Sequence, residues 1–398
     1  MVMWYYMPWL MPYSVHWRWV ILAIIFQTPM PPLKVLIAVF CCASRGVAVS
    51  GLTVPELAYL YGKPLATAEI RVQAADFQVD EQLNFEPSGS GEHLLLQIEK
   101  TGQNTQFIAR ELARLTGLRV RDISYAGLKD RHAVTRQWFC FKWPIKQDLD
   151  WQSWQLEGAQ ILQVVRHYRK LRLGALKRNH FTLRLRRVTE LSALLDRVPL
   201  LAQGVPNYYG EQRFGINGGN LALAERLFSG ESIPDRQIRG LALSASRSFL
   251  FNQVIAARIR QGLFTELLAG DVVQLDGSGS IFMLESVTPE LQQRLVERDI
   301  HLTAPLVGLG KEMVQAAAAA FEQRVLQPWQ SWQQALQLLR VQAGRRSMRL
   351  LPEQLTVATD GDTVQLSFAL PAGCFATSVL RELVNYRDAA RDIAQMEC

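Results

Sequence analysis

The 398-residue chain lacks the usual motifs of metal, nucleotide and disulfide chemistry. Its five cysteines are scattered and form no C-x-x-C pair, which argues against a disulfide framework. Its six histidines form no H-E-x-x-H motif, so no zinc site is expected. No Rossmann glycine pattern occurs, and "GLGKE" at 308–312 places Glu312 where a phosphate-binding loop needs Ser or Thr. The sequence therefore predicts neither a metal nor a cofactor.

Acidic residues are absent from the first fifty positions, which are rich in Trp and Tyr. The apolar runs there, Trp19–Phe26 and Val35–Ala43, are shorter than the roughly 20 residues that a bilayer span needs. Met30–Ala43 imitates a secretory signal. We instead interpret residues 1–50 as an N-terminal extension that is poorly ordered, or as upstream sequence read into protein, with the true start near Val47 or Val49. No membrane partner is expected.

A second stretch without acids, Gly158–Thr189, is strongly basic. The whole chain carries 43 Lys and Arg against 36 Asp and Glu, a net charge of +7. A long run of one sign repels itself unless an anion compensates it, and the RNA phosphate backbone is such an anion. Tyr168 and Phe181 lie within this stretch and could stack on unpaired bases, although Phe181 is equally plausible as a core residue. The candidate RNA-backbone contacts are Arg166, Arg169, Lys170, Arg172, Lys177 and Arg178.

The remaining chain alternates between strand and helix patterns. Strands are predicted at 92–100, 137–143, 180–188 and 364–370, where apolar and polar residues alternate or aromatic residues cluster. An amphipathic helix is predicted from Asn104, a capping residue, to Leu115, with Gly117 ending it. Long helical patterns occupy 242–263, 289–298 and 314–344, and a further helix follows Phe375, with Thr377 as its possible cap. A helical block inserted into an α/β unit explains this order.

The most unusual carboxylate is Asp130, in "YAGLKDRHAVTRQW", where Lys129 and Arg131 flank it. A surface salt bridge is the ordinary explanation for such an acid. Two-carboxylate hydrolysis and metal-assisted chemistry both need further carboxylates that this stretch does not supply. Covalent or base chemistry by one ionised Asp remains, because nearby cations favour its charged form. From the residues alone, the chain is an RNA-binding protein with a candidate carboxylate.

Four long segments resemble, in order, the motifs of the TruD family of tRNA pseudouridine synthases. They are "AGLKDRHAVTRQ" (126–137), "KLRLGALKRNHFTL" (170–183), "GVPNYYGEQRFG" (204–215) and "LPAGCFATSVLRE" (370–382). The resemblance runs from about Leu60 to the last helix. It implies that uridine, at position 13 of certain tRNAs, is isomerised without cofactor or metal. It also implies a role for Asp130 either as nucleophile or as the base that removes a sugar proton.

The same resemblance implies the fold and the other site residues. The expected fold class is α/β (α+β), with a pseudouridine-synthase-like catalytic domain built on a mixed, mostly antiparallel sheet. The catalytic domain would comprise residues 51–203 and 351–398, and a mainly helical TRUD domain would be inserted at 204–350. Phe77, Asn179 and Phe375 would bind the target nucleotide. Lys129, Phe181 and Arg213 would support the site.

Two other functions remain compatible with the residues. A non-catalytic RNA-binding protein or RNA chaperone would keep the basic stretch but would not need Asp130, Asn179 and Phe375 together. An Asp-dependent N-glycosidase would release the base instead of rejoining it. The expected partner is tRNA, the expected location is the cytoplasm, and a monomer is expected.

Overall fold

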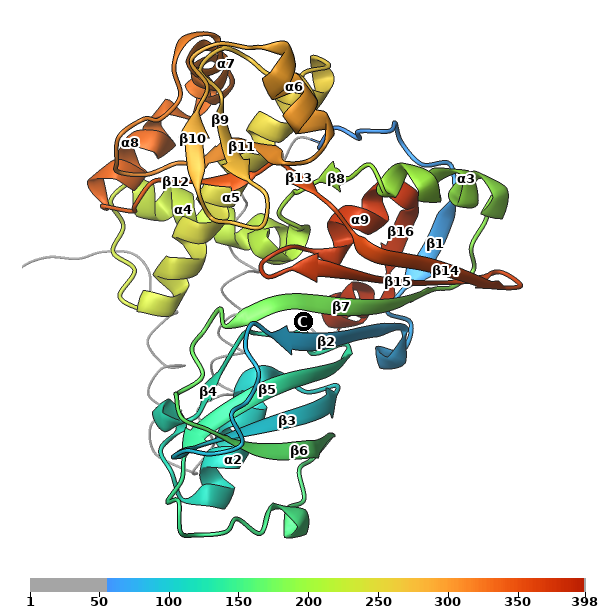
Figure 1. Cartoon of the computed structure of the whole chain (residues 1–398), viewed down its shortest axis with the longest axis vertical. Helices are drawn as coiled ribbons and strands as arrows, with labels where there is room; N and C mark the ends of the chain where they lie inside the picture. Colours follow the sequence, from blue (N-terminus) through green and yellow to red (C-terminus); the bar gives the residue numbers. More distant parts are fainter. Residues whose placement is uncertain (1–55, 397–398) are drawn as a thin grey trace, which may run out of the picture. The chain divides into compact units, whose positions relative to one another are not determined.

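The computed structural model describes residues 56–396, and its main sheet has eight strands. The predictions for residues 1–50 lie outside this part. The strands of the main sheet are β2 (Phe77–Leu83), β3 (His93–Thr101), β4 (Ser124–Tyr125), β5 (Val134–Lys142), β6 (Ala159–His167), β7 (Leu176–Leu185), β14 (Glu353–Asp360) and β15 (Thr363–Pro371). Their order is β14-β15-β7-β2-β5-β3-β6, with β4 beside β5 (Figure 1). The pair β2–β5 is parallel and the other pairs are antiparallel. The predicted mixed, mostly antiparallel sheet is confirmed.

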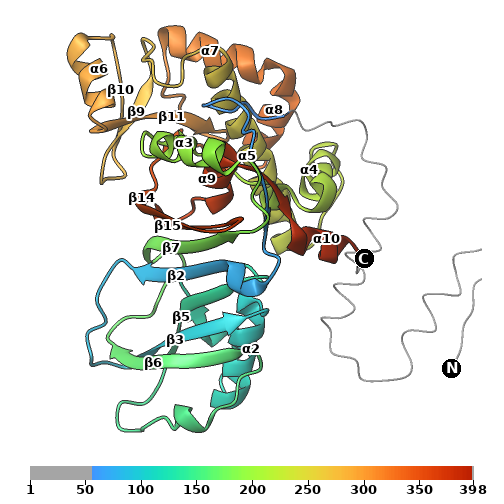
Figure 2. The same ribbon diagram turned by 90° about the vertical axis from the view of Figure 1, so that its right-hand side faces the viewer.

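The strands of this sheet alternate their side chains between its two faces, so apolar residues on a face need to be covered. Helices cover the sheet at two places. Helix α2 (Thr105–Thr116) packs Ile108 and Leu112 against Leu96 and Ile98 of β3. Helices α3 (Leu191–Leu201) and α9 (Ala376–Leu383) pack over β7 and β15, as Figure 2 shows. The main sheet therefore has separate hydrophobic clusters under α2 and under α9.

The ends of α2 follow the sequence prediction, whereas the start of α9 does not. The Asn104 side chain accepts a hydrogen bond of 2.7 Å from the backbone N–H of Phe107, and Gly117 ends α2 in the left-handed conformation at φ 71°. In α9, Phe375 occupies the capping position, and no side chain caps the helix. The prediction that Thr377 caps this helix is wrong, because Thr377 already lies inside its first turn.

Residues between the two parts of the main sheet form a helix-rich block with its own hydrophobic cluster. Its helices are α4 (Gly219–Phe228), α5 (Arg236–Arg260), α6 (Pro289–Val296), α7 (Ala316–Leu326) and α8 (Gln330–Leu338). A four-stranded sheet in the order β10-β9-β11-β12 also belongs to it: β9 (Val272–Leu275), β10 (Ile281–Met283), β11 (Ile300–Leu306) and β12 (Gly344–Ser347). This sheet was not predicted, because three of its strands have four residues or fewer. The long helix expected over 314–344 is divided at Gln327–Trp329 and ends before β12.

Two short pairings connect distant parts of the chain. Strand β8 (Val205–Pro206) pairs with β13 (Arg349–Leu350), where the chain enters and leaves the helix-rich block. Strand β1 (Thr67–Ile70) pairs in parallel with β16 (Asn385–Asp388), which the final helix α10 (Ala389–Met396) follows. The second pairing sets Ile70 opposite Asp388 and so brings the neighbouring Arg71 to the C-terminal segment.

Candidate active site

Asp130 lies at the edge of a pocket of about 950 Å³. Its side chain is 39% exposed, so the carboxylate is open to a ligand. Other lining residues come from the third motif, the start of α9, β16 and α10, and they include Gln212, Thr377, Tyr386 and Arg391. The pocket thus joins the segment around Asp130 to motifs more than seventy positions further along the chain.

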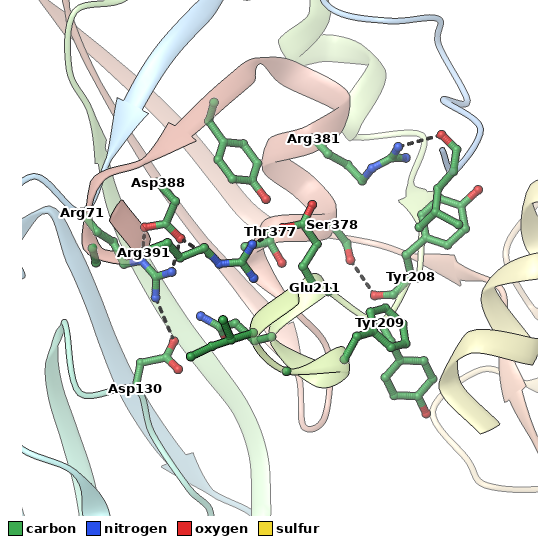
Figure 3. Close-up of a pocket in the computed structure, with 18 of the residues that line it drawn as sticks. Arg71, Asp130, Tyr208, Tyr209, Glu211, Thr377, Ser378, Arg381, Asp388 and Arg391 are labelled. Atoms are coloured by element: carbon green, nitrogen blue, oxygen red, sulfur yellow. Dashed lines mark hydrogen bonds and ion pairs between the residues drawn. The ribbon is translucent and has the colours of Figure 1, made fainter. Parts of the chain in front are cut away.

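Arg71 is the cationic partner of Asp130. Its Nη1 lies 3.7 Å from Asp130 Oδ2, and its side chain is only 5% exposed. Asp388 holds the same guanidinium from the other side, accepting from Nε at 3.0 Å and also from Nη2 (Figure 3). The Gln212 amide completes the set, with its oxygen 2.9 Å from Nη1 in the orientation that satisfies both groups. Arg71 is therefore held next to Asp130 by Asp388 and Gln212.

Lys129 does not point at Asp130. Its ammonium pairs with Glu81 of β2, which is fully buried, and Glu81 also accepts a 3.0 Å bond from the backbone N–H of Trp138. Burial raises the pKa of Glu81, while the ammonium of Lys129 acts to lower it. Lys129 thus anchors the Asp130 segment to the sheet, and its predicted support of the site stays a prediction.

The predicted nucleotide-binding residues Phe77 and Asn179 lie on the neighbouring strands β2 and β7, and neither residue lines the pocket. Phe77 is buried, the Arg71 guanidinium lies 5.5 Å from its ring centroid, and Phe181 packs edge-on against it at 6.2 Å. Phe181 also stacks on Phe368 at 5.6 Å, as a core residue would. Asn179 pairs in register with Glu81, and its side-chain oxygen is buried without a hydrogen-bond partner. A buried acceptor without a partner is uncommon and is available to a ligand donor.

Phe375 and Arg213 lie together on the other side of the pocket. Phe375 packs edge-on against Tyr209 at 5.8 Å, and the Arg213 guanidinium lies 5.7 Å from the Phe375 ring. Arg213 also donates a 3.1 Å hydrogen bond to the Ser244 hydroxyl. A Cβ placed on the lining residue Gly210 would lie 3.8 Å from Phe375. Arg213 therefore braces Phe375 beside the lining residue Gly210, and Phe77, Asn179 and Phe375 themselves do not line the pocket.

Comparison with known proteins gives this arrangement a family. The profile of tRNA pseudouridine synthase D (TruD) matches residues 56–232 and 230–383. The chain belongs to the TruD family. It is 50% identical over 335 residues to the tRNA pseudouridine synthase D of Aeromonas hydrophila, covering 84% of this chain and 95% of that one. The corresponding protein of Colwellia psychrerythraea is 44% identical over 353 residues, covering 86% of this chain and 96% of that one.

A solved structure supports the fold. The TruD crystal structure from Methanosarcina mazei superposes with a TM-score of 0.63, covering 82% of this chain and 95% of that one. Its sequence identity of 21% makes this a likeness of fold alone. The predicted membership of the TruD family and its fold class are confirmed, and membership makes this protein a pseudouridine synthase, an isomerase.

The predicted RNA-backbone residues of this TruD-family protein divide into two groups. Arg166 donates to the carbonyls of Gly91, Trp143, Pro144 and Gln147 at 3.1–3.4 Å, and Arg178 pairs with Glu353. Lys170, Arg172 and Lys177 are exposed and form no ion pair within the described residues, and Arg169 only covers the ring of Tyr168 at 5.1 Å. The second group is free to meet phosphates, whereas the first is already engaged within the fold.

The sequence motifs did not identify Arg71, Asp388 and Lys100 as residues near the site. Arg71 and Asp388 lie at the ends of two four-residue strands, and no local pattern marks their pairing. Lys100, in contrast, lies in a recognisable strand pattern. It continues the alternation of Leu94, Leu96 and Ile98, so its burial was predictable.

Two features are absent from residues 56–396. No group of three or more His, Cys, Asp or Glu side chains in this range is placed to hold a metal ion. In the same range, no helix is both long and apolar enough to cross a membrane.

Proposed function

We propose that this protein isomerises a uridine of tRNA to pseudouridine, at position 13, and that Asp130 is the catalytic residue. The substrate class rests on the relatives, which carry the name tRNA pseudouridine synthase D and match over 95% or more of their length. The position in tRNA and the role of Asp130 rest on the motif around Asp130 and on its setting in the pocket.

The observation that carries the proposal is the pairing of an accessible Asp130 with a buried Arg71. The Asp130 side chain is 39% exposed, while Arg71 is 5% exposed and is held by Asp388. A fixed cation near a carboxylate favours its ionised form, and the ionised form is the one that can attack carbon or accept a proton. Because Asp388 is occupied by Arg71, Asp130 is the carboxylate of this group that remains open to a ligand.

The reaction needs no external oxidant, reductant or energy source. The bond between C1′ and N1 breaks and a bond between C1′ and C5 forms. The proton on C5 leaves, and N1 gains a proton, so atoms and charge balance. Asp130 can promote the first step as a nucleophile at C1′ or as a base that removes a sugar proton, and both routes use the carboxylate in its charged form.

The surrounding residues suit a base that has left its stack. Flipping a nucleotide costs a few kcal/mol, which stacking and hydrogen bonds in the pocket repay. Asn179 has a buried oxygen without a partner and can accept from an N–H of uracil. Phe375 is partly exposed and braced by Arg213, so its ring can stack on the base. Phe77 would act from behind Arg71, which separates it from the pocket.

The RNA contacts would extend beyond the target nucleotide. The exposed cations Arg169, Lys170 and Arg172 lie on the segment before β7. A second pocket of about 510 Å³ is lined by Arg110, Arg121 and residues including Tyr125 and Gln237, and so spans α2 and the start of α5. Cations in a groove can bind the phosphate backbone without reading sequence. We assign both surfaces to the tRNA.

Three further parts of the proposal concern the whole protein. Residues 51–203 and 351–398 form the catalytic domain and residues 204–350 the inserted TRUD domain, consistent with the separate hydrophobic cluster of the helix-rich block. The protein acts in the cytoplasm, where its tRNA substrate is available. We expect it to act as a monomer, and to need no cofactor or metal because the isomerisation balances without further reagents.

The deciding experiment is incubation of purified protein with unmodified tRNA, followed by a pseudouridine-specific chemical adduct and mapping of its position. An adduct at position 13 supports the proposal in full. An adduct elsewhere overturns the position only. An abasic site would mean that the protein is an N-glycosidase, and unchanged RNA that still binds would mean that it is a non-catalytic RNA-binding protein.

A further inference from the structure

Lys100 is a buried cation directly beneath the segment that carries Asp130. It ends the apolar face of β3 that α2 covers, and its side chain is 0% exposed. Its ammonium donates to two backbone carbonyls, that of Asp130 at 2.8 Å and that of Gln103 at 2.7 Å. A cation fully removed from water and directed at the main chain of a candidate catalytic residue requires an explanation.

Other residues at the junction of β3 and α2 also contact the segment that carries Asp130. The Thr105 hydroxyl accepts a 3.0 Å hydrogen bond from the backbone N–H of Lys129. The carbonyl of Gly102 accepts one of 3.1 Å from Nε of Arg131. With Lys100, the turn 100–105 thus contacts three consecutive residues, 129–131, and the middle one is Asp130. We call residues 100–105 the catalytic cradle.

Stability alone does not account for Lys100. Burial lowers its pKa to about 8, against the carboxylates of Asp130 and Glu81, which raise it, while Lys129 lowers it further. Keeping an ammonium in this place therefore costs the fold free energy that an apolar side chain would not. The other members of this face of β3 are Leu94, Leu96 and Ile98, so an apolar residue would continue the pattern. The buried ammonium makes the fold less stable than an apolar side chain would, which indicates that Lys100 has a functional role.

We propose that Lys100 is a positioning residue: by holding the Asp130 carbonyl, it places the Asp130 carboxylate against the pocket and beside Arg71. This inference rests on the proposed function, since it assumes that Asp130 acts on the nucleotide. Lys100 itself does not line the pocket. It acts through the backbone, and a shift of about 1 Å in a reacting group can cost roughly a hundredfold in rate.

The test compares Lys100→Met with the parent protein. Methionine keeps most of the stem and removes both N–H donors and the charge. We expect the single-turnover rate on saturating tRNA to fall at least tenfold, with the Kd for tRNA within twofold of the parent. Lys142→Met is the matched control, because Lys142 lies at the other end of the sheet, is 68% exposed and pairs only with Glu92. The control should change neither the rate nor the Kd.

A pH profile separates positioning from a merely structural role. As Lys100 loses its proton above pH 8, its two hydrogen bonds lose their charge assistance. The parent rate should therefore decline several-fold between pH 7 and 9.5, and Lys100→Met should lack this decline. Ionisation of the uracil itself affects both proteins equally and does not produce a difference between them.

Thr105→Val gives a second, milder change in the catalytic cradle. It removes the acceptor for the Lys129 N–H and keeps the side-chain shape, so it decides the matter if Lys100→Met does not fold. We expect a rate loss of at least threefold with unchanged Kd. A Lys100→Met protein that is as fast as the parent, or that loses rate only in proportion to affinity, overturns the inference, as does an unchanged rate in Thr105→Val. A parent protein that forms no pseudouridine would instead overturn the proposed function.

Discussion

Arg71 and Asp388 form a buried ion pair, and Asp130 lies on the exposed side of that pair. Arg71 Nη1 is 3.7 Å from Asp130, while its Nε donates to Asp388 at 3.0 Å. Asp388 in turn lies 3.7 Å from Nε of Arg391, which pairs with Glu211 (Figure 3). Opposite charges therefore alternate along one side of the pocket. Of these three carboxylates, the central Asp388 is buried, whereas the terminal Asp130 and Glu211 are exposed.

Replacing Asp130 by Asn should abolish isomerisation while leaving the fold and tRNA affinity intact. The amide keeps the size of the side chain but is neither a nucleophile nor a base. The measurement is single-turnover pseudouridine formation together with the Kd for tRNA. Turnover within tenfold of the parent would contradict the assignment of Asp130.

Asp122→Asn is the matched control for that substitution. Asp122 is similarly exposed, at 38%, and pairs with Arg119 at 2.8 Å. It does not line either pocket described here. We expect the control to retain the full rate, so a loss of rate in both variants would indicate a general effect of removing a carboxylate.

Asp388→Asn should lower both stability and rate. The substitution leaves the guanidinium of Arg71 buried with a weakened partner, and breaking a buried pair costs about 3 kcal/mol. Thermal unfolding and single-turnover rate measure the two effects. Asp299→Asn is the control, because Asp299 is 52% exposed, lines neither pocket, and its pair with Arg294 should be worth less than about 1 kcal/mol. Equal effects of the two substitutions would refute the special role of Asp388.

Phe375 distinguishes stacking from packing through two substitutions. If its ring stacks on the flipped base, Tyr should preserve the rate, whereas Leu should cost about 1–3 kcal/mol of transition-state stabilisation. If Phe375 serves only to pack against Tyr209, Leu should be tolerated and Tyr should destabilise the fold, because its hydroxyl would need a buried partner. We expect the first result, measured as single-turnover rate and melting temperature on the same samples. The second result would remove Phe375 from the site.

Salt dependence should identify the cations that meet the RNA. Reversing the charges of Arg169, Lys170 and Arg172 should flatten the slope of log K against log salt by roughly 2, since each phosphate contact contributes about 0.7–0.9. Arg166→Met should leave the slope unchanged and lower the melting temperature, because Arg166 donates hydrogen bonds to four backbone carbonyls. A flattened slope in Arg166→Met alone would show that the two groups of cations had been assigned the wrong way round.

Lys100 also predicts a dependence of stability on pH. Its pKa is about 8 in the folded protein and 10.5 ordinarily, so between these values the unfolded chain binds more protons. The free energy of unfolding of the parent should therefore rise, relative to Lys100→Met, as the pH increases from 8 to 10.5. Denaturant titrations of both proteins at pH 7, 9 and 10.5 measure the difference. A difference that stays constant over this range would mean that Lys100 keeps its ordinary pKa.

Local patterns in the sequence determined much of the fold. Asn104 and Gly117 mark the ends of α2 through their own backbone and side-chain preferences. The alternation in "HFTLRLRRV" gives β7 one buried face, with Phe181 and Leu183 in the core. The motif around Asp130 predicts one catalytic carboxylate among 36 acids, and this stays a prediction. Such features need only neighbouring residues, so they are visible in one dimension.

Only the tertiary structure decided what surrounds Asp130. The parallel pairing of β1 with β16 brings Arg71 to Asp388 across more than three hundred positions, and two four-residue strands carry no sequence pattern strong enough to predict it. Arg166 and Arg169 belong to the same basic stretch, yet Arg166 is bound to carbonyls while Arg169 is exposed. Charge and composition identify which residues can bind RNA or do chemistry. Long-range packing decides which of them are free to do so, because a buried partner satisfies a charged side chain before any ligand arrives.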